Sequence, residues 1–181
     1  MKKIIVSCFL LIALASQAQT SFGIRGGISS TTLVGEGYKA KAGFHLGGFA
    51  NIGIKNGFSL QPELYYATQG AKWEGDGKTE LSYLNIPVLA KYKSAGGFFG
   101  ETGPQIGFML SAHDTWDGEK EDVKEYLNTT DFSWAFGAGY QVNKNLCVNL
   151  RYNLGITSFW NSEKNSAFLI GVHYTLGGSG K

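Results

Sequence analysis

Five charged residues stand in segments of this 181-residue chain that are otherwise largely uncharged, and the chemistry open to them is ion pairing. An isolated charge is costly in a low-dielectric interior, whereas a charge that is paired and hydrogen-bonded is tolerated. If their segments lie side by side, we expect Glu63 and Glu101 to bridge Arg151 and Arg25. The five residues are Arg25, Glu63, Lys91, Glu101 and Arg151.

Ser111, His113 and Asp114 are the residues that come nearest to a hydrolytic site. Residues i and i+2 of one strand share a face, so Ser111 and His113 would be neighbours. Nucleophilic catalysis also needs a third group that orients the base, and nothing in the sequence fixes one. A lipid-modifying enzyme based on Ser111 and His113 is therefore an alternative, and a non-enzymatic protein is the expectation.

The other two histidines do not suggest a metal site. His45 is expected near the rim with the long loops and His173 near the rim with the short turns, too far apart to share an ion. Each is expected to be a barrel-lining or rim histidine. The acidic stretch 114–125 offers carboxylate oxygens, but it lacks the regular spacing of a calcium loop, so a solvated loop is expected. We expect neither a metal nor a cofactor.

Three tryptophans fall between the apolar segments. Exposed together on one side of the molecule, Trp73, Trp116 and Trp160 would form a patch able to contact another envelope protein or a surface glycan. The alternative is that they pack on one another. One helical turn is also expected near the second of them, formed by Val123, Tyr126 and Leu127.

Eight segments with period-two alternation position these residues. They span residues 22–31, 42–54, 58–69, 81–93, 98–110, 131–142, 146–157 and 167–176. Their length exceeds that of soluble strands and fits membrane-spanning ones. Short turns rich in Gly and Asn alternate with long connections, which predicts an all-β, eight-stranded, antiparallel, up-and-down transmembrane β-barrel.

The two faces of these segments differ sharply. Even positions are apolar or aromatic, whereas odd positions carry the charged and amide residues, together with many of the 26 glycines. Alternation alone also fits a soluble secreted or periplasmic barrel that binds an apolar ligand. Strand length, and aromatic residues such as Phe58, Tyr92 and Trp134 near strand ends, favour an apolar face turned toward lipid.

The N-terminus reads as a secretory signal peptide over residues 1–18, with Lys2 and Lys3 before an apolar run and Ala18 at the cleavage site. The barrel domain is predicted over residues 19–176, with a short Gly-rich tail over 177–181. Cleavage removes two of the 16 basic residues and none of the 14 acidic ones, so the mature chain is formally neutral. Such a balance argues against nucleic-acid binding, and the 14% aromatic content argues against disorder.

The chain resembles the PorT-like family of small outer-membrane β-barrel proteins of diderm bacteria. The resemblance is carried by residues 61–72, 84–92, 103–110, 136–140 and 151–156. It implies an eight-stranded barrel in the outer membrane, and some relatives in this family assist protein secretion across that membrane.

Together these features predict an integral outer-membrane barrel that is exported, non-enzymatic and filled inside by polar side chains, because the interior of eight strands is just wide enough for them. Its role would be envelope structure or an interaction platform formed by the long loops. Expected partners are outer-membrane lipid, the barrel-assembly machinery, and another envelope protein or a surface glycan.

Overall fold

The computed structural model describes residues 19–34, 39–72, 77–116, 119–160 and 163–178. The predicted signal peptide, residues 1–18, lies outside them, as do residues 179–181 of the predicted tail. Among the described residues, no helix has the length and apolar character needed to cross a membrane. The elements are β1 (Thr20–Val34), β2 (Lys39–Lys55), β3 (Phe58–Lys72), β4 (Lys78–Lys93), β5 (Phe98–Trp116), β6 (Glu119–Asp122), the 3₁₀ helix η1 (Lys124–Tyr126), β7 (Thr130–Gln141), β8 (Leu146–Gly155), β9 (Ser158–Trp160) and β10 (Glu163–Gly178).

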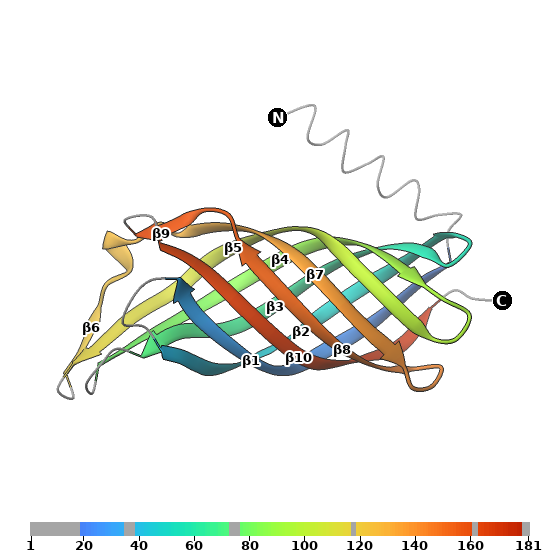
Figure 1. The fold of residues 1–181 in the computed structure, drawn as a ribbon, viewed down its shortest axis with the longest axis horizontal. Coiled ribbons are helices and arrows are strands. Elements are labelled where there is room, and N and C mark those ends of the chain that lie inside the picture. Colours follow the sequence, from blue (N-terminus) through green and yellow to red (C-terminus); the bar gives the residue numbers. More distant parts are fainter. Residues whose placement is uncertain (1–18, 35–38, 73–76, 117–118, 161–162, 179–181) are drawn as a thin grey trace, which may run out of the picture.

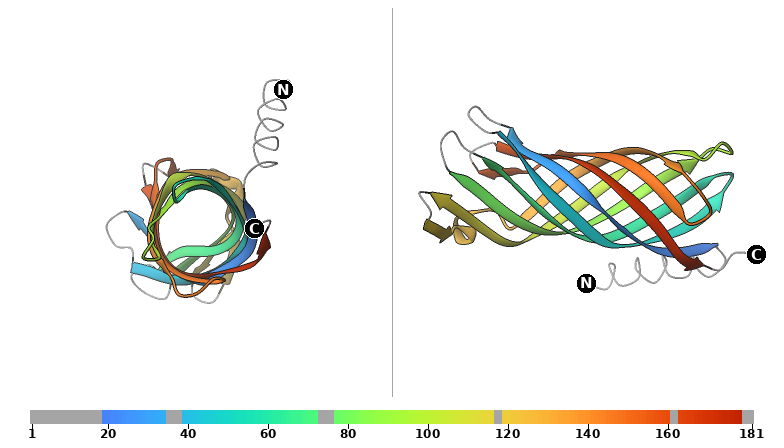
Figure 2. Two further views of the ribbon diagram at one scale, coloured as in Figure 1. Left: turned by 90° about the vertical axis from the view of Figure 1, so that its right-hand side faces the viewer. Right: turned by 90° about the horizontal axis from the view of Figure 1, so that it is seen from below.

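Eight of these strands close into an antiparallel barrel (Figures 1 and 2). Each pairs with its neighbours in the order β1-β2-β3-β4-β5-β7-β8-β10, and β10 pairs back with β1. The short strands β6 and β9 pair with β5 and β10 at one end of the barrel. The prediction of an all-β, eight-stranded, up-and-down barrel is therefore confirmed.

Turn chemistry explains why the chain reverses where it does. Between β2 and β3 the two turn residues, Asn56 and Gly57, have φ angles of 53° and 84°. A two-residue hairpin turn with positive φ at both positions matches the twist of its flanking strands, and Asn-Gly is a favoured sequence for it. The short turns lie at the end of the barrel where both terminal strands begin and end, and the long connections lie at the other end (Figure 1).

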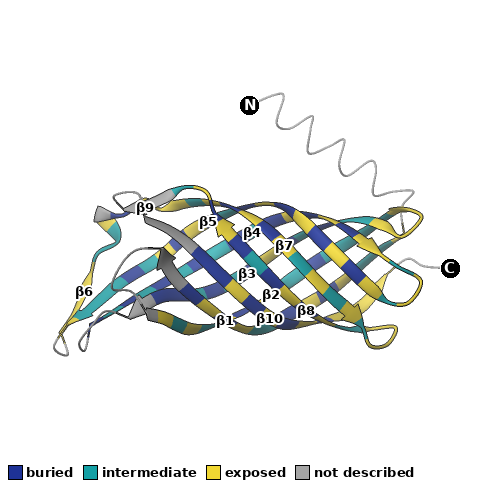
Figure 3. Ribbon diagram, in the orientation of Figure 1, coloured by how far each residue is buried: buried dark blue, intermediate teal, exposed yellow. Residues whose placement is uncertain are grey.

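Apolar side chains cover the outside of the barrel. Ile28 and Leu46 are 65% and 61% exposed, whereas Arg25 is 1% exposed. Buried and more exposed residues alternate along each strand, so the ribbon is banded (Figure 3). This orientation is the opposite of a soluble barrel that holds an apolar ligand inside, and it identifies the outer face as the surface that contacts lipid.

Aromatic rings pair across neighbouring strands near the ends of this surface. Phe58 and Tyr92 have ring centroids 4.8 Å apart, as do Phe98 and Tyr140, close to the short turns. Tyr152 and Phe168 pair at 4.6 Å on the side of the long connections. Rings at both ends of a lipid-facing surface are the interfacial belts of membrane barrels.

The inside of the barrel is less uniformly polar than the alternation predicts. At the long-connection end the interior contains an apolar cluster, and a shift in the β4–β5 register between Ser82 and Tyr83 changes which residues of β5 face inward. Beyond this shift the even positions of β5 face inward in place of the odd ones, and Ala112 is buried. The predicted helical turn is present as η1, and Leu127 after it packs into the same cluster, which consists of Leu81, Tyr83, Met109, Ala112 and Leu127.

The lipid-facing assignment predicts a depth-dependent cost for an outward charge. Leu150 lies half-exposed in the middle of β8. We expect Leu150→Arg to lower the free energy of unfolding in phospholipid vesicles by about 2–4 kcal/mol. Denaturant titration followed by tryptophan fluorescence measures this. Ala95→Arg in an exposed short turn is the matched control, and equal effects of the two changes would contradict the assignment.

Candidate functional site

Arg151 on β8 is the centre of a charged network inside the barrel. Its side chain is fully buried, and its Nη1 and Nη2 atoms donate to Oε2 and Oε1 of Glu63 at 2.7 and 2.9 Å. Its Nε and Nη2 atoms donate to Oε1 of Glu101 at 2.9 and 2.6 Å. One guanidinium therefore binds two carboxylates, one of them in a bidentate manner, which is the strongest geometry for such a pair.

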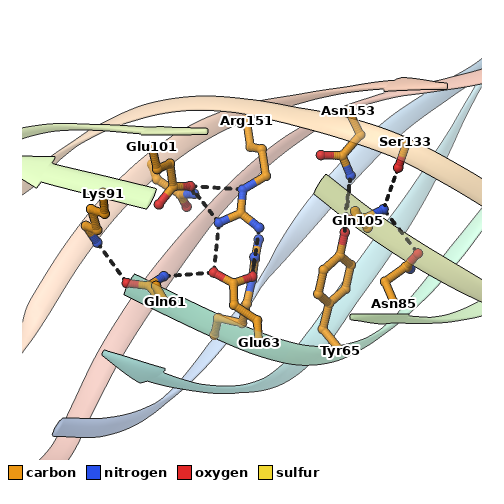
Figure 4. A network of polar contacts seen from close by, with 12 residues as sticks. Gln61, Glu63, Tyr65, Asn85, Lys91, Glu101, Gln105, Ser133, Arg151 and Asn153 are labelled. Carbon is orange, nitrogen blue, oxygen red and sulfur yellow. Dashed lines mark hydrogen bonds and ion pairs between the residues drawn. The ribbon is translucent and has the colours of Figure 1, made fainter. Parts of the chain in front are cut away.

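The two contacts of Arg151 reach different walls of the barrel. In the ring order β3 and β8 are four strands apart, so Glu63 and Arg151 project from opposite walls. Arg25 on β1 and Glu101 on β5 are likewise opposite each other. The network thus crosses the lumen, as Figure 4 shows for Arg151, Glu63 and Glu101.

Arg25 completes this layer. Its Nη1 atom donates to Oε2 of Glu63, and its guanidinium lies 4.7 Å from the ring centroid of Tyr65. Glu63 therefore accepts from both arginines, while Glu101 accepts from Arg151 and, at 3.4 Å, from the Asn149 amide. Two arginines and two glutamates give this layer no formal charge.

Lys91, the fifth predicted residue, lies beside the network but outside its ion pairs. Its Nζ atom donates to Oε1 of Gln61 at 3.2 Å and lies 3.7 Å from the ring centroid of Phe99. Gln61 in turn donates to Oε1 of Glu63 at 2.8 Å. In the described part of the chain, no carboxylate lies within ion-pair distance of the Lys91 ammonium, so its link to the network runs through an amide.

A second, uncharged layer lies on the long-connection side of the first. The Tyr65 hydroxyl donates to Oε1 of Gln105 at 2.7 Å and accepts from Asn153 at 3.1 Å. Gln105 donates to Asn85 and Ser133 at 3.2 and 3.1 Å (Figure 4). The sequence pattern placed most of these amides on the inward face but gave Tyr65 no role, although its position two residues after Glu63 put it on that face.

His45 and His173 are buried and line the inside of the barrel, deeper than the rim positions that the sequence predicted. The ring of His45 packs edge-on against Tyr65, and that of His173 lies 5.3 Å from Phe49. The predicted position of His45 was wrong because β2 begins at Lys39, which places this histidine well inside the strand.

Two glycines make room for large inward side chains. A Cβ atom at Gly137 would lie 2.8 Å from the Glu101 side chain, and one at Gly139 would lie 2.4 Å from the Phe99 ring. Both distances are shorter than atoms tolerate. Part of the glycine excess therefore reflects the crowding of the lumen.

Ser111 and His113 lie two residues apart on β5. They line a groove of about 510 Å³, together with Lys41 and Glu80, near the long-connection end. No hydrogen bond joins Ser111 to His113 in the described residues, and Asp114 alternates to the other face of β5 from His113. Lys41 donates to Glu80 at 3.0 Å, and this bond holds the pKa of the Glu80 carboxyl below its ordinary value.

The predicted tryptophan patch is only partly within the described residues. Trp73 lies outside them, and for Trp160 only the strand that carries it, β9, is described. Trp116 ends β5 and is 63% exposed. Beside it, all four residues of β6 are exposed, and β6 lies at the same end of the barrel as β9 (Figure 1).

The contact between Glu101 and Arg151 predicts strong coupling between substitutions. Arg151→Ala lowers the free energy of unfolding by about 3–5 kcal/mol because it leaves buried carboxylates unpaired. Adding Glu101→Ala costs less than the sum of the single changes, with a coupling energy of about 0.5–3 kcal/mol. Denaturant unfolding of the four proteins of the cycle measures it.

Arg151→Ala combined with Lys41→Ala, in the distant groove, is the control for this cycle. These two changes are expected to add. If the Glu101 and Arg151 substitutions are also strictly additive, the two side chains do not interact as described.

Comparisons with known proteins agree with this architecture. A family model described as "Outer membrane protein beta-barrel domain" matches residues 16–161. The fold is similar to Neisserial surface protein A (TM-score 0.61, 16% identity, covering 87% of this chain and 99% of that one). It is also similar to Ail, the attachment invasion locus protein of Yersinia pestis, in complex with the heparin analogue sucrose octasulfate (TM-score 0.53, 16% identity, covering 87% and 99%). A comparison with curated protein sequences gave no match.

Proposed function

This chain belongs to the outer membrane protein β-barrel domain family and lies in the outer membrane of a diderm bacterium, and from this premise we propose that it is a closed, non-enzymatic barrel that anchors an interaction platform. The barrel would hold the long connections at the outer surface, because outer-membrane barrels place their short turns in the periplasm. The network across its lumen would block passage of solutes.

The observation that carries this proposal is the bidentate contact of Arg151 with Glu63 from the opposite wall. Side chains that meet across the lumen occupy the space a pore would need. The amide layer around Gln105 and the apolar cluster around Leu81 and Met109 support closure at two further levels. Breaking such a buried ion pair costs several kcal/mol, so thermal opening would be rare.

A closed lumen predicts that the purified protein gives no large, stable conductance in planar bilayers. Glu63→Ala combined with Arg151→Ala removes both sides of the central contact and should raise the frequency of small current steps. Trp116→Ala, at the outer tip of β5, should leave the current traces unchanged. A steady current of porin size from the unmodified protein would contradict closure.

The platform assignment is supported by the hairpin of β5 and β6. Trp116 is exposed at the tip of β5, and β6 is exposed and rich in acidic residues. Ail was solved with a polysulfated sugar analogue, but the acidic β6 would repel such a ligand. A protein with a basic surface fits this hairpin better, so we favour another envelope protein over a surface glycan as the partner.

The absence of a Ser111–His113 hydrogen bond in the described residues supports a non-enzymatic role. Their groove lies at the end of the barrel, and the side chains do not converge with Asp114. Loss of a lipid-modifying activity on His113→Ala would overturn this assignment.

The motifs at residues 61–72 and 84–92 support a finer assignment, to the PorT-like proteins. We propose on this basis that the platform assists secretion across the outer membrane, after insertion by the barrel-assembly machinery. A strain lacking the protein should release less exported protein, and the full chain should restore release.

The matched variant in this strain is Trp116→Ala combined with alanine at the four positions of β6. It should insert normally, as judged by outer-membrane fractionation, but fail to restore release. Normal release from the deletion strain would contradict a secretion role and leave the closed-barrel assignment intact.

A further inference from the structure

A cavity of about 890 Å³ lies at the short-turn end of the barrel, on the periplasmic side of the charged network. Four lysines line it, together with His173 and several amide side chains. No aspartate or glutamate is among the described residues that form its wall. The four lysines are Lys55, Lys91, Lys93 and Lys144.

Lys91 supplies the deepest positive charge of this cavity. It is only 8% exposed, and Gln61 is its hydrogen-bond acceptor. The two nearby buried glutamates are already engaged by Arg151 and Arg25. A buried ammonium without a carboxylate is costly unless an anion joins it.

The lysines at the rim are not neutralised either. Lys93 donates to Oε1 of Gln141 at 2.7 Å, which orients its ammonium without removing its charge. Lys55 and Lys144 are exposed beside the turns and take part in no ion pair within the described chain. A concave wall lined by one sign of charge concentrates ions of the opposite sign.

Apolar rings complete the wall. Phe99 lies under the Lys91 ammonium, and Phe49 packs against His173. Both phenylalanines line the cavity. Its volume falls within the range of small-molecule sites, which combine apolar walls with a few placed polar groups.

We propose that this periplasmic cavity binds a small organic anion, with a carboxylate or phosphate group against Lys91 and an apolar body against Phe99 and Phe49. The anion enters past the rim lysines and cannot cross, because the charged network lies between this cavity and the other end of the barrel. The site extends the proposed function and does not depend on the outer platform.

Cys147 makes the charge of the cavity measurable, because this half-buried thiol lines the same wall. In nonionic detergent at low ionic strength, a negatively charged methanethiosulfonate reagent should modify Cys147 about tenfold faster than a positively charged one. The preference should shrink in high salt. Trp116→Cys in a Cys147→Ala background, on the outer hairpin, is the control and should not favour the anionic reagent.

Lysine variants identify the source of this preference. Lys91→Met and Lys93→Met should each reduce it, whereas Lys120→Met on β6, at the far end, should not. A thiol that reacts equally with both reagents, reacts faster with the cationic one, or reacts with neither would overturn the proposal.

Binding is tested with phenyl phosphate, benzoate, inorganic phosphate and benzylammonium as probes. Phenyl phosphate or benzoate should protect Cys147 from modification by a neutral reagent, inorganic phosphate less well, and benzylammonium not at all. Comparing the protection given by phenyl phosphate with that given by benzoate shows which anionic group the site prefers. Isothermal titration gives the affinities.

Lys91→Met should weaken binding of the preferred anion by about tenfold or more, since a charge-assisted hydrogen bond is lost. If Lys91→Met does not fold, Lys93→Met and Lys144→Met are the alternatives. Both side chains lie at the exposed rim, so these variants should fold in high yield and still weaken binding. No protection by either organic anion at millimolar concentration would overturn the site, while a silent planar bilayer would still support closure.

Discussion

The contact of one arginine with two glutamates is the constraint on which the rest of this barrel depends. Arg151 has no access to water, so Glu63 and Glu101 must reach it from β3 and β5 with the correct stagger. A slip of any of these strands by one residue would turn its side chains to the opposite face. The ion pairs therefore favour the register that also places the apolar surface outside, and an eight-stranded ring is small enough for side chains to meet across it.

Much of this architecture could be predicted from the sequence because its causes are local. Alternation with period two distinguishes the two faces of each strand, and Asn56 with Gly57 specifies a tight reversal whatever surrounds it. The inward position of Glu63 follows from the same alternation. The partner of each charge does not, since it depends on the stagger of strands far apart in the chain. Nothing in the sequence therefore indicates that Lys91 bonds to Gln61.

Other features depend on departures from regularity that leave no clear trace in the sequence. A single register shift opposite Ser82 reverses the faces of β5 beyond Leu110, so Ala112 points inward and joins Leu127. Strands that continue past the expected membrane boundary bury His45. The first effect changes the direction of a side chain, and the second changes only its depth in the barrel.

The pairing of β1 with β10 has a consequence for assembly. The short turns allow β2 with β3, β4 with β5, and β7 with β8 to form as local hairpins, whereas β1 and β10 come from opposite ends of the chain. Closing a long loop is entropically costly, so we expect this seam to be the last ladder to form. The Arg25–Glu63 pair needs only β1, β2 and β3, whereas Arg151 on β8 binds Glu63 on β3 across the lumen, so this contact requires the sheet to curl. Curling of the sheet and pairing of Arg151 with Glu63 are thus coupled, and a flat, open sheet would leave these charges apart.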